Sequence, residues 1–323
     1  MIPKPKQAGK LRIMVLAGGI SHERDISLKS GRRVADALTE YGASVELREP
    51  DENLLANIKK DKPDVIWPVL HGASGEDGAL RDILALTGVP YVGAGPEGAR
   101  LAWDKAVAKI LVAGQGIQTP ASVTLPKETF KELDAQSVLK AISASLALPI
   151  VVKPAKSGSA QGVTMVTKAD QLAQAMIDAY VYCDVAIVEK AVVGTELAIS
   201  VIDLGAGPIA LPAVEIEPIA GHFGYQERYT AGETNYYVPA RLTKAVAEKA
   251  AAMAISAHNA LGLRHLSRID MIVDKKGTPW FLEANVLPGL TETSLLPQAV
   301  LAAGHSLGEV YHSLAVAAIR GRG

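Results

Sequence analysis

The chain has a single cysteine, Cys183, among its 323 residues. One thiol excludes an internal disulfide and any metal site built from several cysteines, and it fits a reducing compartment. The net charge is −1, which gives no electrostatic reason to expect nucleic acid or a membrane surface as a partner. The apolar run before Gly18 is too short for a secretory signal or a membrane span. We therefore expect a cytoplasmic protein whose partners are small molecules.

The first part of the chain alternates apolar runs with amphipathic stretches. RIMVLAGG, SVELREP, DVIWPVLHG and VPYVG predict strands, while SHERDISLKSGRRVADALTEYG and GEDGALRDILALTG predict helices. This alternation indicates a parallel sheet covered by helices on both faces. Ligands of such sheets gather at the carboxyl ends of the strands, where the loops AGGISHE and LHGASGEDG lie. We expect this N-terminal α/β domain to span residues 1–104.

The other two thirds of the chain predict α+β structure in two further domains. Residues 105–194 contain two strands around a Gly/Ser-rich loop, then a helix and a strand, which favour a small antiparallel sheet. Residues 195–323 carry more strands, an Ala-rich helix and a terminal helix. The stretch at about 219–239 has few apolar anchors and is long for a loop, so we interpret it as a lid over a site.

The stretch HLSRIDMIVDKKGTPWFLEAN predicts a hairpin with one polar face. Pairing Val273 with Trp280 sets Asp270 opposite Glu283 and Arg268 opposite Asn285. Since side chains alternate along a strand, these four groups share one face, and the other face carries apolar side chains, namely Ile269, Met271, Val273, Trp280, Leu282 and Ala284. Opposed carboxylates repel unless a cation or a shared proton joins them, and this set of oxygens suits Mg²⁺. The alternative is an exposed hairpin face on which Arg268 neutralises one acid.

Other candidate residues are ambiguous when taken alone. The loop KPAKSGSAQGV offers lysines and flexible backbone amides that could bind phosphate oxygens, although an ordinary glycine-rich turn has the same composition. The chain has neither GxxxxGK[ST] nor, at AGGISHE, GxGxxG. Glu189, Lys190 and Glu196 surround a strand end where a base and a ribose could bind, or they are solvated surface charges.

Eight stretches together, in this order, resemble the D-alanine:D-alanine ligases of the ATP-grasp superfamily. They are AGGISHERDISL, LHGASGEDGAL, WDK, VVKPAKSGSAQGV, VEKAVVGTE, RYTAGETNYYVPA, SRIDMIV and FLEANVLPGLTETSLLP, and the resemblance covers nearly the whole chain. It implies a three-domain ATP-grasp fold with ATP between the sheets of the second and third domains. It also implies a homodimer.

The resemblance assigns roles around ATP. Asp270, Glu283 and Asn285 match the ligands of two Mg²⁺ ions, for which Mn²⁺ could substitute. Lys105 and Lys153 match lysines that contact phosphates. The positions that match the surroundings of adenine and ribose are Glu189, Lys190, Val192, Glu196, Phe281 and Leu282.

The resemblance also assigns roles around the two amino acids. Glu23 matches the acid that holds the first ammonium group, and His71 lines the same pocket, although alone Glu23 could simply favour a helix dipole and His71 could be structural. Arg268 and the Gly289 amide match oxyanion donors. The other matched positions are Ser159 and Tyr229, which link to the glutamate, and Ser294 and Leu295, which bind the second carboxylate. Arg228 stands where the family usually has lysine, and arginine differs in geometry.

The implied activity is ATP-dependent formation of D-alanyl-D-alanine for peptidoglycan precursor synthesis. One D-alanine carboxylate attacks the γ-phosphate, and the amine of a second D-alanine displaces phosphate from the acylphosphate. Arg228 and the stretch NVLPGLTETS, which departs from the commoner forms, leave open a ligase with another acceptor, such as a D-hydroxy acid, D-serine or another amine. A third alternative is a nucleotide-binding regulatory protein without turnover.

Overall fold

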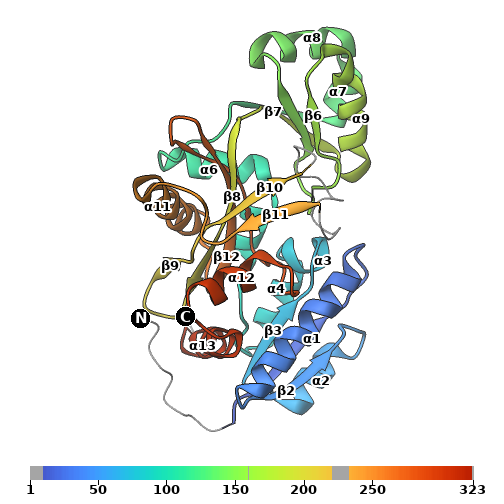
Figure 1. Ribbon diagram of the computed structural model, residues 1–323. Helices are drawn as coiled ribbons and strands as arrows, with labels where there is room; N and C mark the ends of the chain where they lie inside the picture. Colours follow the sequence, from blue (N-terminus) through green and yellow to red (C-terminus); the bar gives the residue numbers. More distant parts are fainter. Residues whose placement is uncertain (1–9, 159, 220–232, 322–323) are drawn as a thin grey trace.

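The computed structural model describes residues 10–158, 160–219 and 233–321 (Figure 1). Within these ranges the strands form three sheets, of three, four and six strands. The first sheet lies in the lower part of Figure 1, the four-stranded sheet at the top and the six-stranded sheet between them. One parallel and two antiparallel or mixed sheets agree with the predicted fold class, and the predicted domain bounds stay predictions.

The N-terminal domain has a parallel sheet in the order β2-β1-β3. Its elements are β1 (Arg12–Ala17), α1 (Arg24–Glu40), β2 (Ser44–Arg48), α2 (Leu54–Asp61), β3 (Val65–Val69), α3 (Ala73–Glu76) and α4 (Ala79–Leu86). The strand predicted at VPYVG is wrong, because this segment makes only a bridge between Ile66 and Tyr91. Pro90 has no N–H to donate to a ladder, and Gly93 turns the chain with φ +105°.

The central domain is an antiparallel sheet in the order β4-β7-β5-β6, as predicted. Its elements are β4 (Ser122–Pro126), α7 (Lys127–Glu132), α8 (Ala135–Leu146), β5 (Ile150–Pro154), β6 (Thr164–Val166), the 3₁₀ turn η1 (Ala169–Gln171), α9 (Leu172–Tyr182) and β7 (Val185–Lys190). Apolar side chains of α8 and α9, such as Ile142 and Met176, form a core with Val152 and Val188 of the sheet. The opposite face of this sheet is left for the site.

The C-terminal domain has the order β11-β10-β8-β12-β13, with β9 paired to β8. Its strands are β8 (Gly194–Asp203), β9 (Pro208–Ala210), β10 (Val214–Pro218), β11 (Thr234–Tyr237), β12 (Leu266–Asp274) and β13 (Pro279–Asn285). The associated helices are α5 (Pro96–Trp103), α6 (Lys105–Gly114), α11 (Lys244–Ala260), α12 (Leu295–Ala302) and α13 (Leu307–Arg320). Part of the predicted lid, β11, is a strand paired with β10; residues 220–232 lie outside the described chain.

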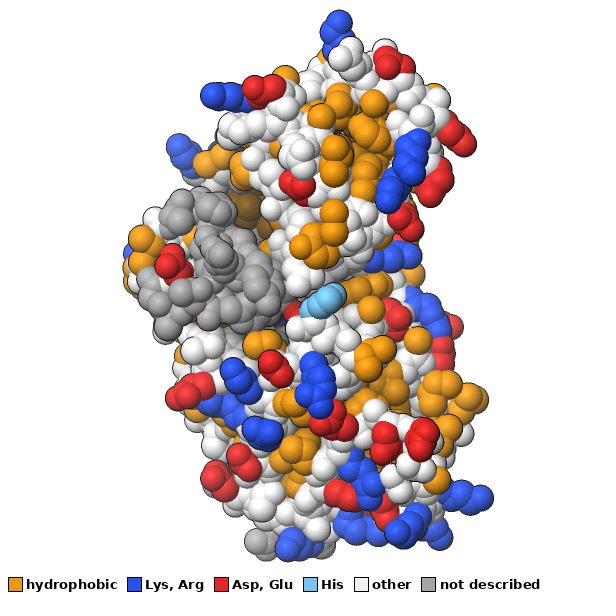
Figure 2. Space-filling model, turned by 90° about the vertical axis from the view of Figure 1, so that its right-hand side faces the viewer, with side chains coloured by type: hydrophobic (Ala, Val, Ile, Leu, Met, Phe, Trp, Pro, Cys, Tyr) orange, Lys and Arg blue, Asp and Glu red, His pale blue; other side chains and the backbone are white. Residues whose placement is uncertain are grey.

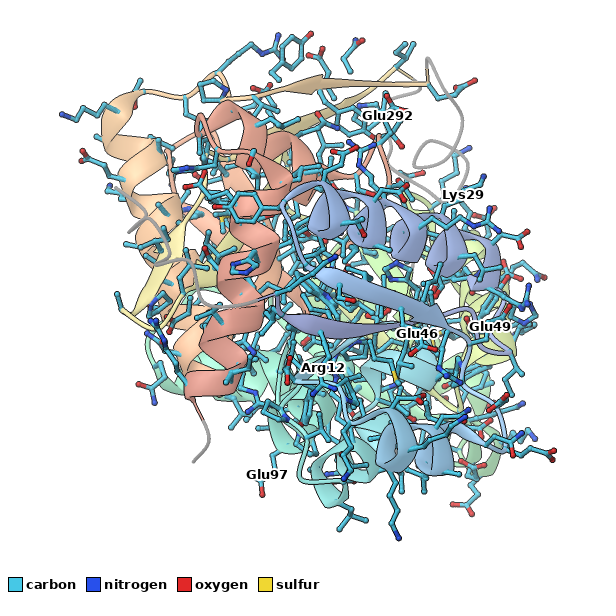
Figure 3. The ribbon with its side chains drawn as sticks, turned by 90° about the horizontal axis from the view of Figure 1, so that it is seen from below. Arg12, Lys29, Glu46, Glu49, Glu97 and Glu292 are labelled. Atoms are coloured by element: carbon cyan, nitrogen blue, oxygen red, sulfur yellow. The ribbon has the colours of Figure 1, made fainter. Side chains whose placement is uncertain are left out.

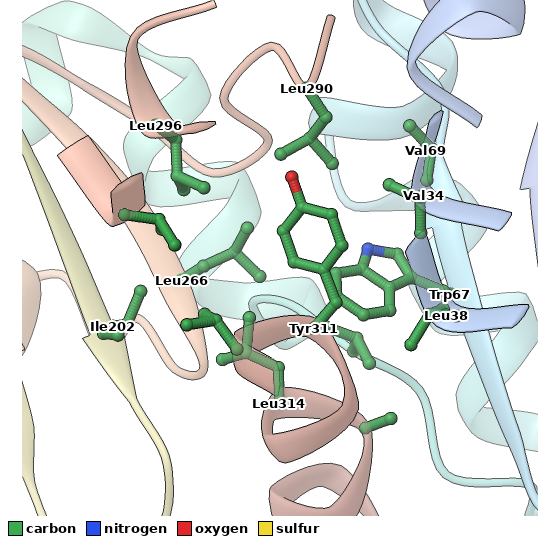
Figure 4. Close-up of a cluster of buried hydrophobic side chains, with 14 of the residues drawn as sticks. Val34, Leu38, Trp67, Val69, Ile202, Leu266, Leu290, Leu296, Tyr311 and Leu314 are labelled. Atoms are coloured by element: carbon green, nitrogen blue, oxygen red, sulfur yellow. The ribbon is translucent and has the colours of Figure 1, made fainter. Parts of the chain in front are cut away.

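A shared hydrophobic core joins the N- and C-terminal domains (Figure 4). Trp67 of β3 meets Tyr311 of α13 edge to face, with ring centroids 5.2 Å apart. Leu290 of the loop before α12 and Leu296 of α12 itself pack into the same cluster. This core fixes the loops of the N-terminal domain against the C-terminal sheet.

The surface carries mixed charges. Basic and acidic side chains are interspersed over the face shown in Figure 2. Glu46 lies in the edge strand β2 and Glu49 directly after it (Figure 3), and Arg12 pairs with Asp64 at 3.0 Å. Charge beside an edge strand disfavours pairing with another sheet. Among the described residues, no helix is both long and apolar enough to cross a membrane.

Candidate active site

The two predicted pairs of polar residues in the β12–β13 hairpin are confirmed. Asp270 pairs with Glu283 and Arg268 with Asn285, as the sequence predicts. Arg268 and Asp270 are only 8% and 6% exposed, so the alternative of an exposed hairpin face is wrong. Arg268 nevertheless neutralises an acid, since its Nε and Nη2 donate to the two Asp270 oxygens at 2.7 and 2.8 Å. Such a bidentate pair orients both side chains.

A β-bulge changes the register beyond Asp270. Met271 pairs with Phe281 and Val273 with Pro279, so the predicted pairing of Val273 with Trp280 is wrong. The extra residue of β13 is Leu282, which lines a pocket instead of packing on the apolar face.

The bulge also relocates the aromatic side chains of β13. Trp280 now pairs with Ile272, and its Nε1 donates to Asp274 at 3.0 Å. Phe281 is fully buried in the core with Met253, and it lines neither of the pockets described below. Of the two residues predicted to pack beside adenine, Leu282 lines the inter-sheet pocket and Phe281 does not.

An inter-sheet pocket of about 360 Å³ separates the central and C-terminal sheets. It brings together nine of the predicted residues, which are Lys105, Lys153, Glu189, Lys190, Val192, Glu196, Asp270, Leu282 and Glu283. Val151, Met165 and Ile272 add apolar walls. A pocket that combines apolar walls with a few charged groups suits a ligand that has both a base and an anionic part.

A junction pocket of about 120 Å³ lies where the three domains meet. It brings together the predicted residues Glu23, His71, Lys105, Arg268, Glu283, Asn285, Gly289, Ser294 and Leu295. The two pockets share Lys105, Ser157 and Glu283. Lys105 Nζ lies 3.3 Å from Glu283 Oε2 and donates to the Ser157 carbonyl at 2.6 Å. A group bound at this boundary is therefore within reach of both pockets.

Glu23 is held against two glycines. It follows β1 at the N-cap of α1 without capping the helix through its side chain. A Cβ on Gly72 or on Gly158 would come within 3.1 Å of Glu23 Oε2. Gly72 also has φ +78°, which favours glycine. The Glu23 carboxylate thus faces the junction pocket, which favours a role in binding over a role in the helix dipole.

His71 and Glu76 are two buried groups of this pocket whose pKa values are shifted in opposite directions. Burial, with a smaller contribution from Arg268, lowers the pKa of His71 to about 4, so the ring is neutral, and its Nε2 lies 3.2 Å from Ser30 Oγ. Burial, followed by the charge of Glu23, raises the pKa of Glu76 to about 8. Glu76 accepts the Gly72 N–H at 2.8 Å. The sequence did not single out Glu76, although this acid belongs to the predicted carboxyl-end loop LHGASGEDG.

Gly289 and Ser294 also line the junction pocket. Ser294 Oγ accepts the N–H of Thr291 at 3.0 Å, and a Cβ on Gly289 would approach this oxygen to 2.7 Å. The Leu290 N–H donates to Ser30 Oγ at 3.3 Å, which ties this loop to α1. Three predicted residues, Ser159, Arg228 and Tyr229, lie outside the described chain.

A buried charge cluster lies at the far side of the inter-sheet pocket. Glu189 Oε1 accepts from Lys153 Nζ at 2.5 Å, and its Oε2 accepts from Lys109 Nζ at 2.6 Å. Although burial disfavours the charged carboxylate, the two ammonium groups hold the pKa of Glu189 below its usual value. Sequence analysis missed Lys109, because a lysine in a helix is normally a surface residue.

The oxygens of the hairpin face fit a divalent ion. Asp270, Glu283 and Asn285 supply the carboxylate and amide oxygens that Mg²⁺ prefers. In the structure, Arg268 forms an ion pair with Asp270 and Lys105 forms one with Glu283. Among the residues that the structure describes, no three His, Cys, Asp or Glu side chains form a metal-binding group. A Mg²⁺ ion here would need further oxygens from phosphate and water, as is usual for this ion.

Three sheets with one pocket between the last two and another at the junction with the first define an ATP-grasp protein. The family model described as D-ala D-ala ligase N-terminus matches residues 42–94, and that described as D-ala D-ala ligase C-terminus matches residues 111–315. The chain belongs to the D-alanine–D-alanine ligase family.

Individual proteins agree with this assignment. The D-alanine–D-alanine ligase of Bordetella petrii is 38% identical over 312 residues, which cover 97% of this chain and 93% of that protein. The solved VanG D-Ala:D-Ser ligase from Enterococcus faecalis has a TM-score of 0.81 and 28% identity, covering 96% of this chain and all of that one. The D-alanine–D-alanine ligase from Bacillus anthracis complexed with ATP has a TM-score of 0.81 and 27% identity, covering 97% and 98%.

Proposed function

We propose that the protein joins two D-alanines to D-alanyl-D-alanine at the expense of ATP, for peptidoglycan precursor synthesis. The observation that carries this proposal is the contact between the two pockets at Lys105 and Glu283. A nucleotide in the inter-sheet pocket directs its terminal phosphate to the boundary, and an amino acid in the junction pocket directs its carboxylate to the same place. Proximity of the two reacting groups is the main requirement of phosphoryl transfer.

ATP binds with its base between the apolar walls of the inter-sheet pocket. Glu189 binds polar groups of the base, Glu196 binds the ribose hydroxyls, and Lys153, which pairs with Glu189, binds a phosphate group of the nucleotide. Lys105 contacts the phosphates at the boundary. Asp270, Glu283 and Asn285 would hold Mg²⁺, which would supply positive charge beside the transferring phosphoryl group.

The first D-alanine binds in the junction pocket with its ammonium group at Glu23. His71, held neutral by burial, lines the pocket without adding a charge that would repel the ammonium. The D-alanine carboxylate then attacks the γ-phosphorus, the bond to the β-phosphate oxygen breaks, and the products are an acylphosphate and ADP. Lys105 is placed to bind the phosphoryl oxygens during this step.

The second D-alanine binds with its carboxylate at Ser294 and at the start of α12, where Leu295 is the first residue. Its amine, in the neutral form, attacks the acylphosphate carbonyl. Arg268 and the Gly289 amide stabilise the oxyanion of the tetrahedral intermediate. Collapse of the intermediate expels phosphate and leaves the peptide bond. Ser159, Arg228 and Tyr229 remain assigned to this site from the sequence alone.

A different acceptor is the second candidate. The structural similarity to a D-Ala:D-Ser ligase supports it, because D-serine differs from D-alanine by one hydroxyl group. A hydrophobic pocket rejects an added hydroxyl only weakly, whereas a matched hydrogen bond selects for it strongly. Where the second amino acid would bind, the junction pocket is lined by Thr291, Thr293 and Ser294, whose hydroxyl groups could make such a bond.

The test uses purified protein with ATP, Mg²⁺ and D-alanine. We expect phosphate release that depends on D-alanine, and a product with the mass of the dipeptide. L-alanine and Mg²⁺-free buffer are the controls. An equimolar pool of D-alanine, D-serine and D-lactate, analysed by mass spectrometry, identifies the preferred acceptor. No phosphate release with any D-amino acid would refute the proposed activity.

We also propose that the protein acts in the cytoplasm as a homodimer, as its resemblance to the family implies. Light scattering of the purified protein at micromolar concentration tests the dimer. A mass equal to one chain of 33.9 kDa would contradict it.

A further inference from the structure

Lys109 is a buried lysine in α6 that the proposed reaction does not use. It is 4% exposed, it lines neither pocket, and its Nζ donates to Glu189 Oε2 at 2.6 Å. Glu189 and Lys153, by contrast, both line the inter-sheet pocket. Lys109 therefore stands behind the carboxylate, on the side away from the pocket.

Charge balance does not require Lys109. Two ammonium groups and one carboxylate leave a net charge of +1 in a cluster whose members are all less than 7% exposed. Burial lowers the pKa of Lys109, and burial together with the charge of Lys153 outweighs the opposite effect of Glu189. A buried pair of Lys153 and Glu189 alone would be neutral. Burying the second lysine therefore costs free energy of folding that the ion pair alone does not offset, which points to a functional role for Lys109.

The geometry suggests what the second lysine does. Lys109 occupies Glu189 Oε2, so Lys153 contacts only Oε1. An ammonium group has three donors, and Lys153 therefore keeps donors for a ligand. Without Lys109, both carboxylate oxygens could turn to Lys153, which would draw both side chains together and away from the pocket.

We propose that Lys109 is a positioning residue for nucleotide recognition: it holds the Glu189 carboxylate so that Glu189 accepts the 6-amino group of adenine while Lys153 stays directed into the pocket. This inference rests on the proposed binding of ATP between the two sheets. Lys109 touches no substrate in this scheme and acts only through Glu189.

The packing of α6 strengthens this inference. The helix packs against β13 and α11 of the C-terminal domain, and Ala108 and Val112 belong to that core. Glu189 belongs to β7 of the central sheet. The Lys109–Glu189 pair therefore connects the two sheets that enclose the nucleotide, and it sets their separation at the base end of the pocket.

The decisive experiment measures ATP binding directly by calorimetry with Mg²⁺ and without D-alanine. Lys109→Met keeps the aliphatic chain and leaves the neutral Lys153–Glu189 pair, so we expect a folded protein. Its affinity for ATP should fall about tenfold, the equivalent of one charge-assisted hydrogen bond that no longer orients its partner. Lys109→Gln keeps an N–H donor and should recover part of the loss. The preference for ATP over ITP, which has a 6-oxo group, should shrink in Lys109→Met.

Val112→Ala is the matched control, because it loosens the same helix without contact to Glu189. It should lower the melting temperature but leave ATP affinity and the ATP/ITP ratio within twofold of wild type. The KM for D-alanine should be unchanged in all three variants. The inference is overturned if Lys109→Met binds ATP as wild type does, if Val112→Ala weakens binding equally, or if Lys109→Met does not fold. Wild-type protein that binds ATP but forms no dipeptide would refute the proposed function and leave this inference intact.

Discussion

Replacing Glu76 by glutamine should stabilise the protein at neutral pH. Burial raises the pKa of this carboxyl from 4.5 to about 8 in the folded state. Below pH 4.5 the group is protonated in both states and contributes nothing to the pH dependence. As pH rises from 4.5 to 8, the unfolded chain releases the proton and the folded chain retains it, so the folded state loses stability. Glutamine is neutral throughout and removes this loss.

The magnitude follows from the pKa difference. Each pH unit between the two pKa values corresponds to about 1.4 kcal/mol. Between pH 4.5 and pH 7 the loss amounts to about 3 kcal/mol, and at pH 5 it is below about 1 kcal/mol. The Gly72 N–H, which now donates to Glu76 Oε1, finds the amide oxygen of glutamine in the same place.

The assay is urea unfolding of wild type and Glu76→Gln at pH 5, 6, 7 and 8. The stability difference between Glu76→Gln and wild type should increase progressively with pH in favour of the variant, from below about 1 kcal/mol at pH 5 to about 3 kcal/mol at pH 7. Glu97→Gln, a substitution at an exposed position of α5, is the control. Its free energy of unfolding should show the same pH dependence as that of wild type. A difference between Glu76→Gln and wild type that is constant over this pH range would refute an elevated pKa and the neutral Glu76 that we infer from it.

Three further outcomes follow from the site. Glu283→Ala should reduce Mg²⁺-dependent turnover by at least about 100-fold while the protein stays folded, measured by phosphate release and circular dichroism; near-normal activity would contradict the proposed metal site. Gly289→Ala should raise the KM for the acceptor more than that for ATP, because its Cβ approaches Ser294 Oγ to 2.7 Å; equal effects on both substrates would contradict this placement. Phe281→Ala should destabilise the fold by about 3–5 kcal/mol, whereas Leu282→Ala should mainly raise the KM for ATP; the reverse pattern would contradict the observed bulge.

The polar hairpin face could be predicted because its information is local. Side chains alternate along a strand, so four polar residues at even spacing mark one face without knowledge of the rest of the fold. The bulge could not be predicted in this way. Phe281 and Leu282 are both apolar, so the sequence does not reveal which of them faces the core and which the pocket. Either side chain could be buried in the core, so only the bulge at Leu282 decides that Phe281 is.

Glu76 and Lys109 were missed for a different reason. A charged residue in a loop or a helix normally lies at the surface, and only its neighbours in the fold make it buried. Lys109 meets Glu189 across 80 positions of the sequence, and Glu76 is buried by residues from several elements. The failed strand at VPYVG is similar, since its apolar residues are buried without a partner strand beyond the bridge at Tyr91.

One feature of α6 could nevertheless have been read from the sequence. Lys105 and Lys109 are four positions apart, so they lie on the same face of the helix, one turn apart. In the structure Lys105 meets Glu283 of the C-terminal sheet, and Lys109 meets Glu189 of the central sheet. A single helix face therefore binds an acid from each sheet.

Lys105 and Lys109 connect α6 to two acids that lie at different places along the site. Glu283, the partner of Lys105, lines both pockets, whereas Glu189, the partner of Lys109, lines only the inter-sheet pocket, so this pocket runs from Glu189 to the boundary at Glu283. A nucleotide bound along this direction has its base and its phosphates at opposite ends. Because α6 itself packs on the C-terminal core, a shift of the central domain would separate Lys109 from Glu189 before it disturbed Lys105 and Glu283. Recognition of the base should therefore be more sensitive to domain movement than binding of the phosphates.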